Sequence, residues 1–400
     1  MSKPLGGELI MKTLPAANIR SWVIVVVTAS LSLLAVSFAA ASRVGDDQPV
    51  GKQEAPDARV TTDPDGTLHL PPLTIPVSNL LTPAASSGLV KYFEFLGTPA
   101  SAIFSEPPDA AKIAEHRRAF NEHFKPILQR ERQLYPVDIT AGNLSGVYVD
   151  VITPKGGVDV KNKRRVLIEL HGGGFIDGAR VVGAIESVPV ASLEKIKVLA
   201  VDYRQAPEYR FPAASDDVVA VYRELLKTYK PENIGIYGCS AGGLLTAEAT
   251  ARIESEKLPR PGAIGIFCAG AGGLNDGDSG YLGTALIGYE VTRPNKMRHP
   301  SVDDGLYFVN ANLDDPLVLP IRSTSTLAKF PPTLIITSSR DNAASSAMYT
   351  HSQLVKLGVY AELHVWADLP HGFFTFAPDF PESRDAWDVV VRFFDSHLGT

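Results

Sequence analysis

The sequence predicts an α/β fold with a mostly parallel central sheet flanked by helices and covered by a helical cap. The first observation is a series of short, almost continuous runs of Val, Ile and Leu, typical of strands buried on both faces. The second is that helical patterns separate these runs, which favours parallel pairing. The third is size, since 400 residues with 45% hydrophobic side chains can enclose a large core. The predicted strands are 147–152, 165–170, 198–201, 234–237, 263–267, 333–337 and 361–366, with a helix at 215–229.

The amino-terminal segment has the layout of a secretory signal. Basic residues precede an uncharged stretch from Trp22 to Ala41, which ends in three alanines. We expect a signal peptide over residues 1–41, cleaved after Ala41, and a secreted or periplasmic protein; translation starting at Met1 or at Met11 fits equally. The alternative is an uncleaved membrane anchor, because the stretch is about long enough to span a bilayer.

The remaining chain divides by composition. Residues 42–83 are rich in Pro, Asp, Gly and Thr and predict a linker or flexible arm. Residues 84–134 show helical spacing interrupted by prolines, including Pro126, and predict short cap helices. Residues 135–400 form the predicted catalytic α/β domain, in which 274–328 interrupts the alternation as a cap insertion.

Charge and cysteine content exclude several classes of protein. The net charge of −6 and the absence of a dense basic patch argue against a nucleic-acid partner. The two cysteines, Cys239 and Cys268, are too few for a disulfide framework. Each ends a predicted strand, and we expect two buried thiols rather than a bridge, although the two strands could be neighbours.

The most informative motif surrounds Ser240. Gly238-Cys239-Ser240-Ala241-Gly242 follows an apolar strand and precedes a helical segment. A G-x-S-x-G motif between strand and helix is typical of a nucleophile elbow, in which a sharp turn exposes the serine hydroxyl and leaves no room for flanking side chains. A second candidate serine, Ser279 in a Gly-Asp-Ser-Gly sequence, lacks this context and is interpreted as part of a turn.

A serine nucleophile needs a base and a group that orients the base. His371 follows the last predicted strand, and Asp341 follows the preceding one by a short loop. Asp368 is a rival for the acid, but it shares a loop with His371 and cannot easily reach Nδ1 from the side opposite the serine. The order Ser, Asp, His agrees with this assignment.

A glycine-rich loop supplies the predicted oxyanion donors. His171-Gly172-Gly173-Gly174 follows a strand, and backbone N–H groups can approach a developing alkoxide closely only where side chains are absent. We expect the amides of Gly172, Gly173 and Ala241 to form the oxyanion hole.

Together these residues resemble the hormone-sensitive-lipase-like branch of the α/β-hydrolases, the bacterial acetyl-esterase type. The resemblance runs from about Tyr92 to the C-terminus and includes HGGGF, the DYRQAPE segment at 202–208 and the two motifs around Ser240 and His371. It implies hydrolysis of short to medium acyl carboxylic esters, a helical cap, a small-molecule ester as partner, no cofactor and no metal. Membrane contact is expected only if the amino-terminal segment stays uncleaved, and the oligomeric state stays open.

Two alternatives stay open. The first is a catalytically silent ligand-binding protein of the same fold, although such relatives typically lack a triad member and this chain has all three. The second is an amidase or transacylase, which would use the same residues. The expected substrate-binding residues are aromatic: Phe175, Tyr92, Phe93 and Tyr281.

Overall fold

The computed structural model describes residues 59–96, 112–286 and 306–400, in two compact units, 1–74 and 75–400. The predicted signal or anchor segment lies outside the described residues. In the first unit, β1 (Thr61–Thr62) and β2 (Leu68–His69) form a short antiparallel pair. No helix in the described ranges is long and apolar enough to cross a bilayer.

The second unit contains an eight-stranded sheet with the order β10-β9-β8-β7-β5-β6-β4-β3. The strands from β5 to β10 pair in parallel, while β3 and β4 are antiparallel at one edge. The strands are β3 (Val137–Leu144), β4 (Val147–Pro154), β5 (Val166–Leu170), β6 (Val198–Val201), β7 (Ile234–Cys239), β8 (Ala263–Phe267), β9 (Thr333–Arg340) and β10 (Ala361–Pro370). The predicted fold class is confirmed; the sequence analysis missed β3, whose exposed polar residues carry no buried-strand pattern.

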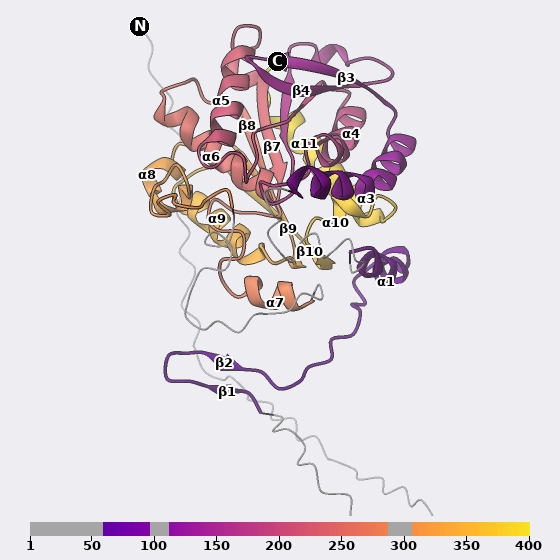
Figure 1. Ribbon diagram of the computed structural model, residues 1–400, viewed down its shortest axis with the longest axis vertical. Coiled ribbons are helices and arrows are strands. Elements are labelled where there is room, and N and C mark those ends of the chain that lie inside the picture. Colours follow the sequence, from indigo (N-terminus) through magenta and orange to yellow (C-terminus); the bar gives the residue numbers. More distant parts are fainter. Residues whose placement is uncertain (1–58, 97–111, 287–305) are drawn as a thin grey trace, which may run out of the picture. The chain divides into compact units, whose positions relative to one another are not determined.

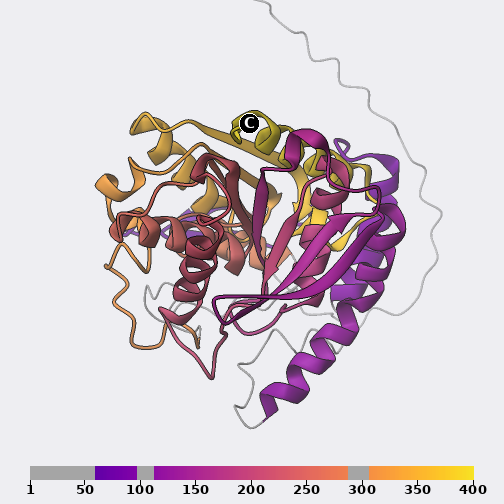
Figure 2. The same ribbon diagram turned by 90° about the horizontal axis from the view of Figure 1, so that it is seen from above.

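Helices cover both faces of this sheet (Figures 1 and 2). Alternate side chains of β5 enter two separate cores: Ile168 packs with α5, α6 and α9, whereas Leu167 packs with α4 and α11. The helices are α1 (Pro83–Leu96), α3 (Ile113–Leu134), α4 (Val181–Glu194), α5 (Ala213–Leu225), α6 (Ala241–Ser255), α7 (Ser279–Leu286), α8 (Thr324–Leu327), α9 (Ala344–Lys356), α10 (Phe373–Phe376) and α11 (Pro381–His397). Short 3₁₀ helices span Val160–Asn162, Pro231–Asn233 and Pro320–Arg322.

Helix α3 corrects one prediction. Pro126 is predicted to break the helical segment, but it lies inside α3, which is 22 residues long and continues past the proline to Leu134. Phe120, Phe124 and Ile127 are buried in a small core with residues of α4. Burial of these side chains offsets the backbone hydrogen bond that proline cannot donate.

Candidate active site

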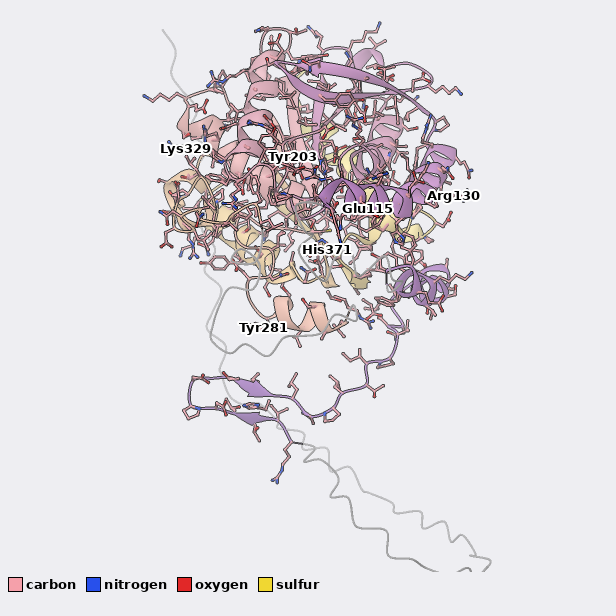
Figure 3. All side chains as sticks on the ribbon, viewed as in Figure 1. Glu115, Arg130, Tyr203, Tyr281, Lys329 and His371 are labelled. Carbon is pink, nitrogen blue, oxygen red and sulfur yellow. The ribbon has the colours of Figure 1, made fainter. Side chains whose placement is uncertain are left out.

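All the predicted catalytic segments lie at the carboxyl ends of the parallel strands. Parallel strands end at the same edge, and β5, β7, β9 and β10 are followed there by the loop or turn that contains His171, Ser240, Asp341 and His371, respectively. Open α/β sheets bind their ligands at these carboxyl ends. Figure 3 labels His371, which follows β10, and Tyr281, which belongs to helix α7.

Ser240 occupies a strained turn between β7 and α6. Its φ of 58° and ψ of −121° lie in a region that side-chain-bearing residues rarely adopt. A Cβ atom at either Gly238 or Gly242 would overlap the carbonyl oxygen of Leu170 on β5. The flanking glycines therefore permit β5 and α6 to approach the turn, as an elbow requires.

Asp341 and His371 are brought together. His371 Nδ1 lies 2.6 Å from Asp341 Oδ1. The carboxylate is fully buried and also accepts hydrogen bonds from Ala343 N–H at 2.8 Å and from the Thr337 hydroxyl at 2.9 Å. Tyr92 donates its hydroxyl proton to the His371 carbonyl oxygen at 3.1 Å. These bonds hold the carboxylate against one ring nitrogen and steady the histidine backbone.

The electrostatics of this pair favour an ionised acid. Burial alone would raise the pKa of Asp341, but the charge of His371 and hydrogen bonds from His371, Ala343 and Thr337 outweigh it and lower the pKa. Burial opposes the histidine cation, yet the Asp341 charge and hydrogen bond raise the pKa of His371 above its ordinary value. The pair thus stabilises an imidazolium when one forms.

Asp368, the rival acid, has other partners. Its carboxylate forms an ion pair with Arg340 and accepts the Ser78 N–H at 2.8 Å. The bond from His371 Nδ1 goes to Asp341 instead. The other candidate serine, Ser279, begins helix α7 rather than occupying a turn, and its hydroxyl donates to the Asn342 carbonyl oxygen at 2.8 Å.

The glycine-rich loop lies against Ser240. A Cβ built on Gly172 would be 3.4 Å from the Ser240 Cβ, and one on Gly173 would overlap the Asp177 carbonyl oxygen. His171 is buried and stacks on Tyr203 with ring centroids 4.2 Å apart, and burial lowers the pKa of its imidazole to about 4. A neutral, stacked histidine thus anchors the loop next to the serine.

The oxyanion prediction needs one correction. The Gly172 amide donates to Glu186 Oε1 at 3.2 Å, so it is directed at a buried carboxyl group and is not a free donor. Among the described residues, the amides of Gly173, Gly174 and Ala241 donate to no protein acceptor. Gly174 was missed, although the third glycine of the same motif could have indicated it.

A buried acidic pair supports this loop from behind. Glu186 on α4 accepts the Gly172 amide and, through Oε2, the Cys239 amide at 3.3 Å. Burial raises the pKa of Glu186 to about 8, although these two hydrogen bonds oppose the shift. Burial and the adjacent Glu186 raise the pKa of Glu169 as well. Sequence reasoning did not find this pair, because Glu169 lies in strand β5 and Glu186 in helix α4, and no local pattern shows that the two side chains meet.

The predicted substrate-binding aromatic residues fall into two groups. Phe175 is 3% exposed and stacks on Tyr307 with centroids 4.5 Å apart, and Tyr92 is also buried, so both pack in the interior. Their predicted role in lining a substrate site gains no support from this packing. Phe93 and Tyr281 are only partly buried. Helix α7, which carries Tyr281, is tied beside the acid by the bonds of Ser279 to Asn342 and Ser345.

Comparison with known proteins places the chain in a family. Residues 167–375 match the model of the alpha/beta hydrolase fold family, so the chain belongs to it. The chain resembles the crystal structure of an esterase, E25, with a TM-score of 0.71 and 27% identity over 83% of this chain and 99% of that one. It also resembles an esterase from the bacterial hormone-sensitive lipase family, with a TM-score of 0.64 and 26% identity over 78% and 99% of the two chains.

Curated relatives have related names. An acetyl-hydrolase of Streptomyces hygroscopicus is 28% identical over 59% of this chain and 77% of its own length. Esterase LipU of Mycobacterium tuberculosis is 26% identical over 64% of this chain and 86% of its own.

Proposed function

We propose that the protein is a serine carboxylesterase that hydrolyses short to medium acyl esters through an acyl-Ser240 intermediate. The observation that carries the proposal is the 2.6 Å bond between Asp341 and His371 at the sheet edge where Ser240 occupies its strained turn. The names of the relatives, acetyl-hydrolase and esterase, support the same reaction class.

In the acylation step, His371 Nε2 accepts the Ser240 hydroxyl proton while Oγ attacks the ester carbonyl carbon. Asp341 holds the Nδ1–H tautomer and stabilises the imidazolium, in agreement with the lowered pKa of the acid and the raised pKa of His371. The imidazolium then donates its proton to the leaving alcohol, and the acyl group stays on Ser240. Water attacks this ester with His371 again as the base, which releases the carboxylic acid and restores the serine.

The negative charge of each tetrahedral intermediate requires N–H donors. We assign the amides of Gly173, Gly174 and Ala241, whose hydrogens have no acceptor among the described residues. A donor of this kind typically contributes about 3 kcal/mol to the stability of the transition state. Glu186 holds the Gly172 amide and thereby the start of the loop in place.

A covalent label tests the nucleophile. An organophosphate should add once to the protein at Ser240, and Ser240→Ala should lose both labelling and turnover. Ser279→Ala is the matched control, because this serine also has a glycine two positions before it, but its hydroxyl donates to the Asn342 carbonyl oxygen. Labelling at Ser279 would overturn the assignment. An unlabelled, inactive protein with normal folding would favour the ligand-binding alternative.

Acyl-chain length tests the substrate class. For p-nitrophenyl esters, kcat/KM should rise from acetate to butyrate or hexanoate, because each buried methylene contributes about 0.8 kcal/mol. It should then fall, when a longer chain displaces the carbonyl from the amides of the glycine loop. A rise that continues to palmitate would indicate a lipase, and faster turnover of matched amides would indicate an amidase.

We further propose that residues 1–41 are a cleaved signal peptide and that the mature protein is secreted or periplasmic. The basic residues, the uncharged stretch and the three alanines before Ser42 support this proposal. Amino-terminal sequencing of the exported protein should start at Ser42. Recovery of Met1 or Met11 from a membrane fraction would favour the uncleaved anchor.

A further inference from the structure

A buried cysteine lies beside the acid–base pair, and the proposed mechanism does not use it. Cys268 follows β8, is 1% exposed and is a free thiol. Its Sγ, a carboxylate oxygen of Asp341 and a ring nitrogen of His371 all lie within 4.8 Å of one another. In the described part of the chain this is the one group of His, Cys, Asp and Glu side chains with such spacing.

We propose that Cys268, Asp341 and His371 form a binding site for a thiophilic divalent cation of the zinc class, and that the bound cation reversibly inhibits the enzyme. The inhibition depends on the esterase function proposed above, whereas the binding itself does not. The established chemistry of Zn²⁺ fits this donor set, since thiolate, imidazole and carboxylate are its three common protein ligands.

The geometry requires only a small adjustment. Ligand atoms at about 2.0–2.3 Å from a tetrahedral Zn²⁺ are about 3.3–3.8 Å apart. The three ligand atoms lie within 4.8 Å of one another, so the longest separation between them has to shorten by at most roughly 1 Å. The 2.6 Å distance between Nδ1 and Oδ1 has to lengthen by a similar amount. His371 can supply this movement, because its side chain is 21% exposed whereas that of Asp341 is fully enclosed.

Cation binding would disable the base in two ways. With the metal on Nδ1, the proton of the neutral imidazole resides on Nε2, so Nε2 can no longer accept the Ser240 proton. The Asp341 oxygen that oriented the ring would instead be a metal ligand. The thiol of Cys268 loses its proton to solvent when the thiolate binds. Oxygen-seeking cations such as Mg²⁺ gain nothing from sulfur and nitrogen donors and should not inhibit.

The neighbouring thiol provides a matched control. Cys239 is also buried and free, and its sulfur lies beside Cys268, but it does not belong to the group that includes Asp341 and His371. Cys239→Ala and Cys268→Ala thus remove equal volumes from adjacent positions, while only the second removes a proposed ligand.

The first experiment titrates Zn²⁺ into the wild-type enzyme, both variants and a Mg²⁺ control, with hydrolysis of p-nitrophenyl butyrate as the readout. Wild type and Cys239→Ala should lose activity and recover it with a chelator. Cys268→Ala should keep its metal-free activity and need at least about 10-fold more Zn²⁺ for half inhibition. Equal zinc sensitivity of Cys268→Ala and wild type would overturn the proposal, as would loss of sensitivity in Cys239→Ala alone.

The second experiment does not depend on turnover. Cd²⁺ titrated into wild type and Ser240→Ala should produce the ultraviolet cadmium–thiolate absorption band with one equivalent bound, and Cys268→Ala should not show it. If metal-free wild type hydrolyses no ester, the proposed esterase function is wrong, but the cadmium–thiolate band still tests whether the metal site exists. Absence of the band in folded wild type rejects the metal site even if esterase activity is present.

Discussion

The two halves of the candidate site are built in different ways. One half, Asp341 and His371, is a side-chain pair joined by a 2.6 Å hydrogen bond. The other half is backbone: the strained turn at Ser240 and the amides of the glycine loop, both held by close packing and by buried Glu186. The first half therefore depends on the charge of two groups, and the second depends on the space around several main-chain atoms.

Each half contains a buried carboxyl group, and the pKa values of the two groups are shifted in opposite directions. Asp341 has charged and polar partners, and its pKa is lowered in spite of complete burial. Glu186 is equally buried but accepts only backbone amides besides its contact with Glu169, and its pKa is raised to about 8. The partners of Asp341 favour its anion, whereas burial favours the protonated form of Glu186, whose role is to accept hydrogen bonds from the backbone.

The largest effect should come from the side-chain half. Asp341→Asn keeps the shape but stabilises the wrong histidine tautomer, and kcat should fall by about 10⁴-fold. Asp368→Asn is the control, because Asp368 pairs with Arg340 rather than with His371. Its kcat on p-nitrophenyl butyrate should stay within about 10-fold of wild type. A larger loss in Asp368→Asn than in Asp341→Asn would reverse the assignment of the acid.

The backbone half should respond to added volume. Gly242→Ala places a Cβ on the Leu170 carbonyl oxygen, and overpacking of this kind costs at least about 1–3 kcal/mol of unfolding free energy. Gly156→Ala has no atom within 4 Å of the new Cβ and should be close to neutral. Urea denaturation of both variants measures the difference, and equal midpoints would show that the elbow is not tightly packed.

Removal of the Glu186 carboxyl group should also weaken the backbone half. Glu186→Leu leaves the amides of Gly172 and Cys239 buried without acceptors, at a cost of roughly 1–3 kcal/mol each. Glu186→Gln keeps an acceptor oxygen for one of the two amides but turns an NH₂ group toward the other, so it should lose less stability and activity than Glu186→Leu. Thermal unfolding and kcat of the two variants give the comparison; similar losses in both would mean that one retained acceptor does not hold the two amides in place.

The same glutamate makes stability depend on pH. Because its folded-state pKa is raised to about 8 from 4.5, the native state binds more protons than the unfolded state between these values. The contribution of Glu186 to stability therefore falls as pH rises from 4.5 to 8, with a slope of at most about 1.4 kcal/mol per pH unit. Urea denaturation at pH 6 and pH 8 should show a smaller decline in Glu186→Gln than in wild type. An equal decline would contradict the raised pKa.

The smallest effect concerns the backbone of His371. Tyr92→Phe removes the hydrogen bond to the His371 carbonyl oxygen, which is worth about 1 kcal/mol. We expect at most about a 5-fold decrease in kcat, with KM almost unchanged. A decrease as large as that of Asp341→Asn would mean that Tyr92 contributes to the chemistry as well as to packing.

The sequence by itself determined the features that are written in contiguous residues. Apolar runs predicted six of the parallel strands to within a few residues, and the G-x-S-x-G context predicted the turn at Ser240, because strand burial and a glycine-flanked turn depend on local pattern. Asp341 was selected over Asp368 from its position after the preceding strand, and the contact with His371 agrees with that choice.

Only the tertiary structure decided which partner each polar group has. It directs the Gly172 amide to Glu186, buries Phe175 against Tyr307 and continues α3 through Pro126. Each of these outcomes depends on a residue distant in the chain that brings an acceptor or an apolar surface to the site. Such pairings are set by packing between elements, and a local sequence pattern contains no record of them.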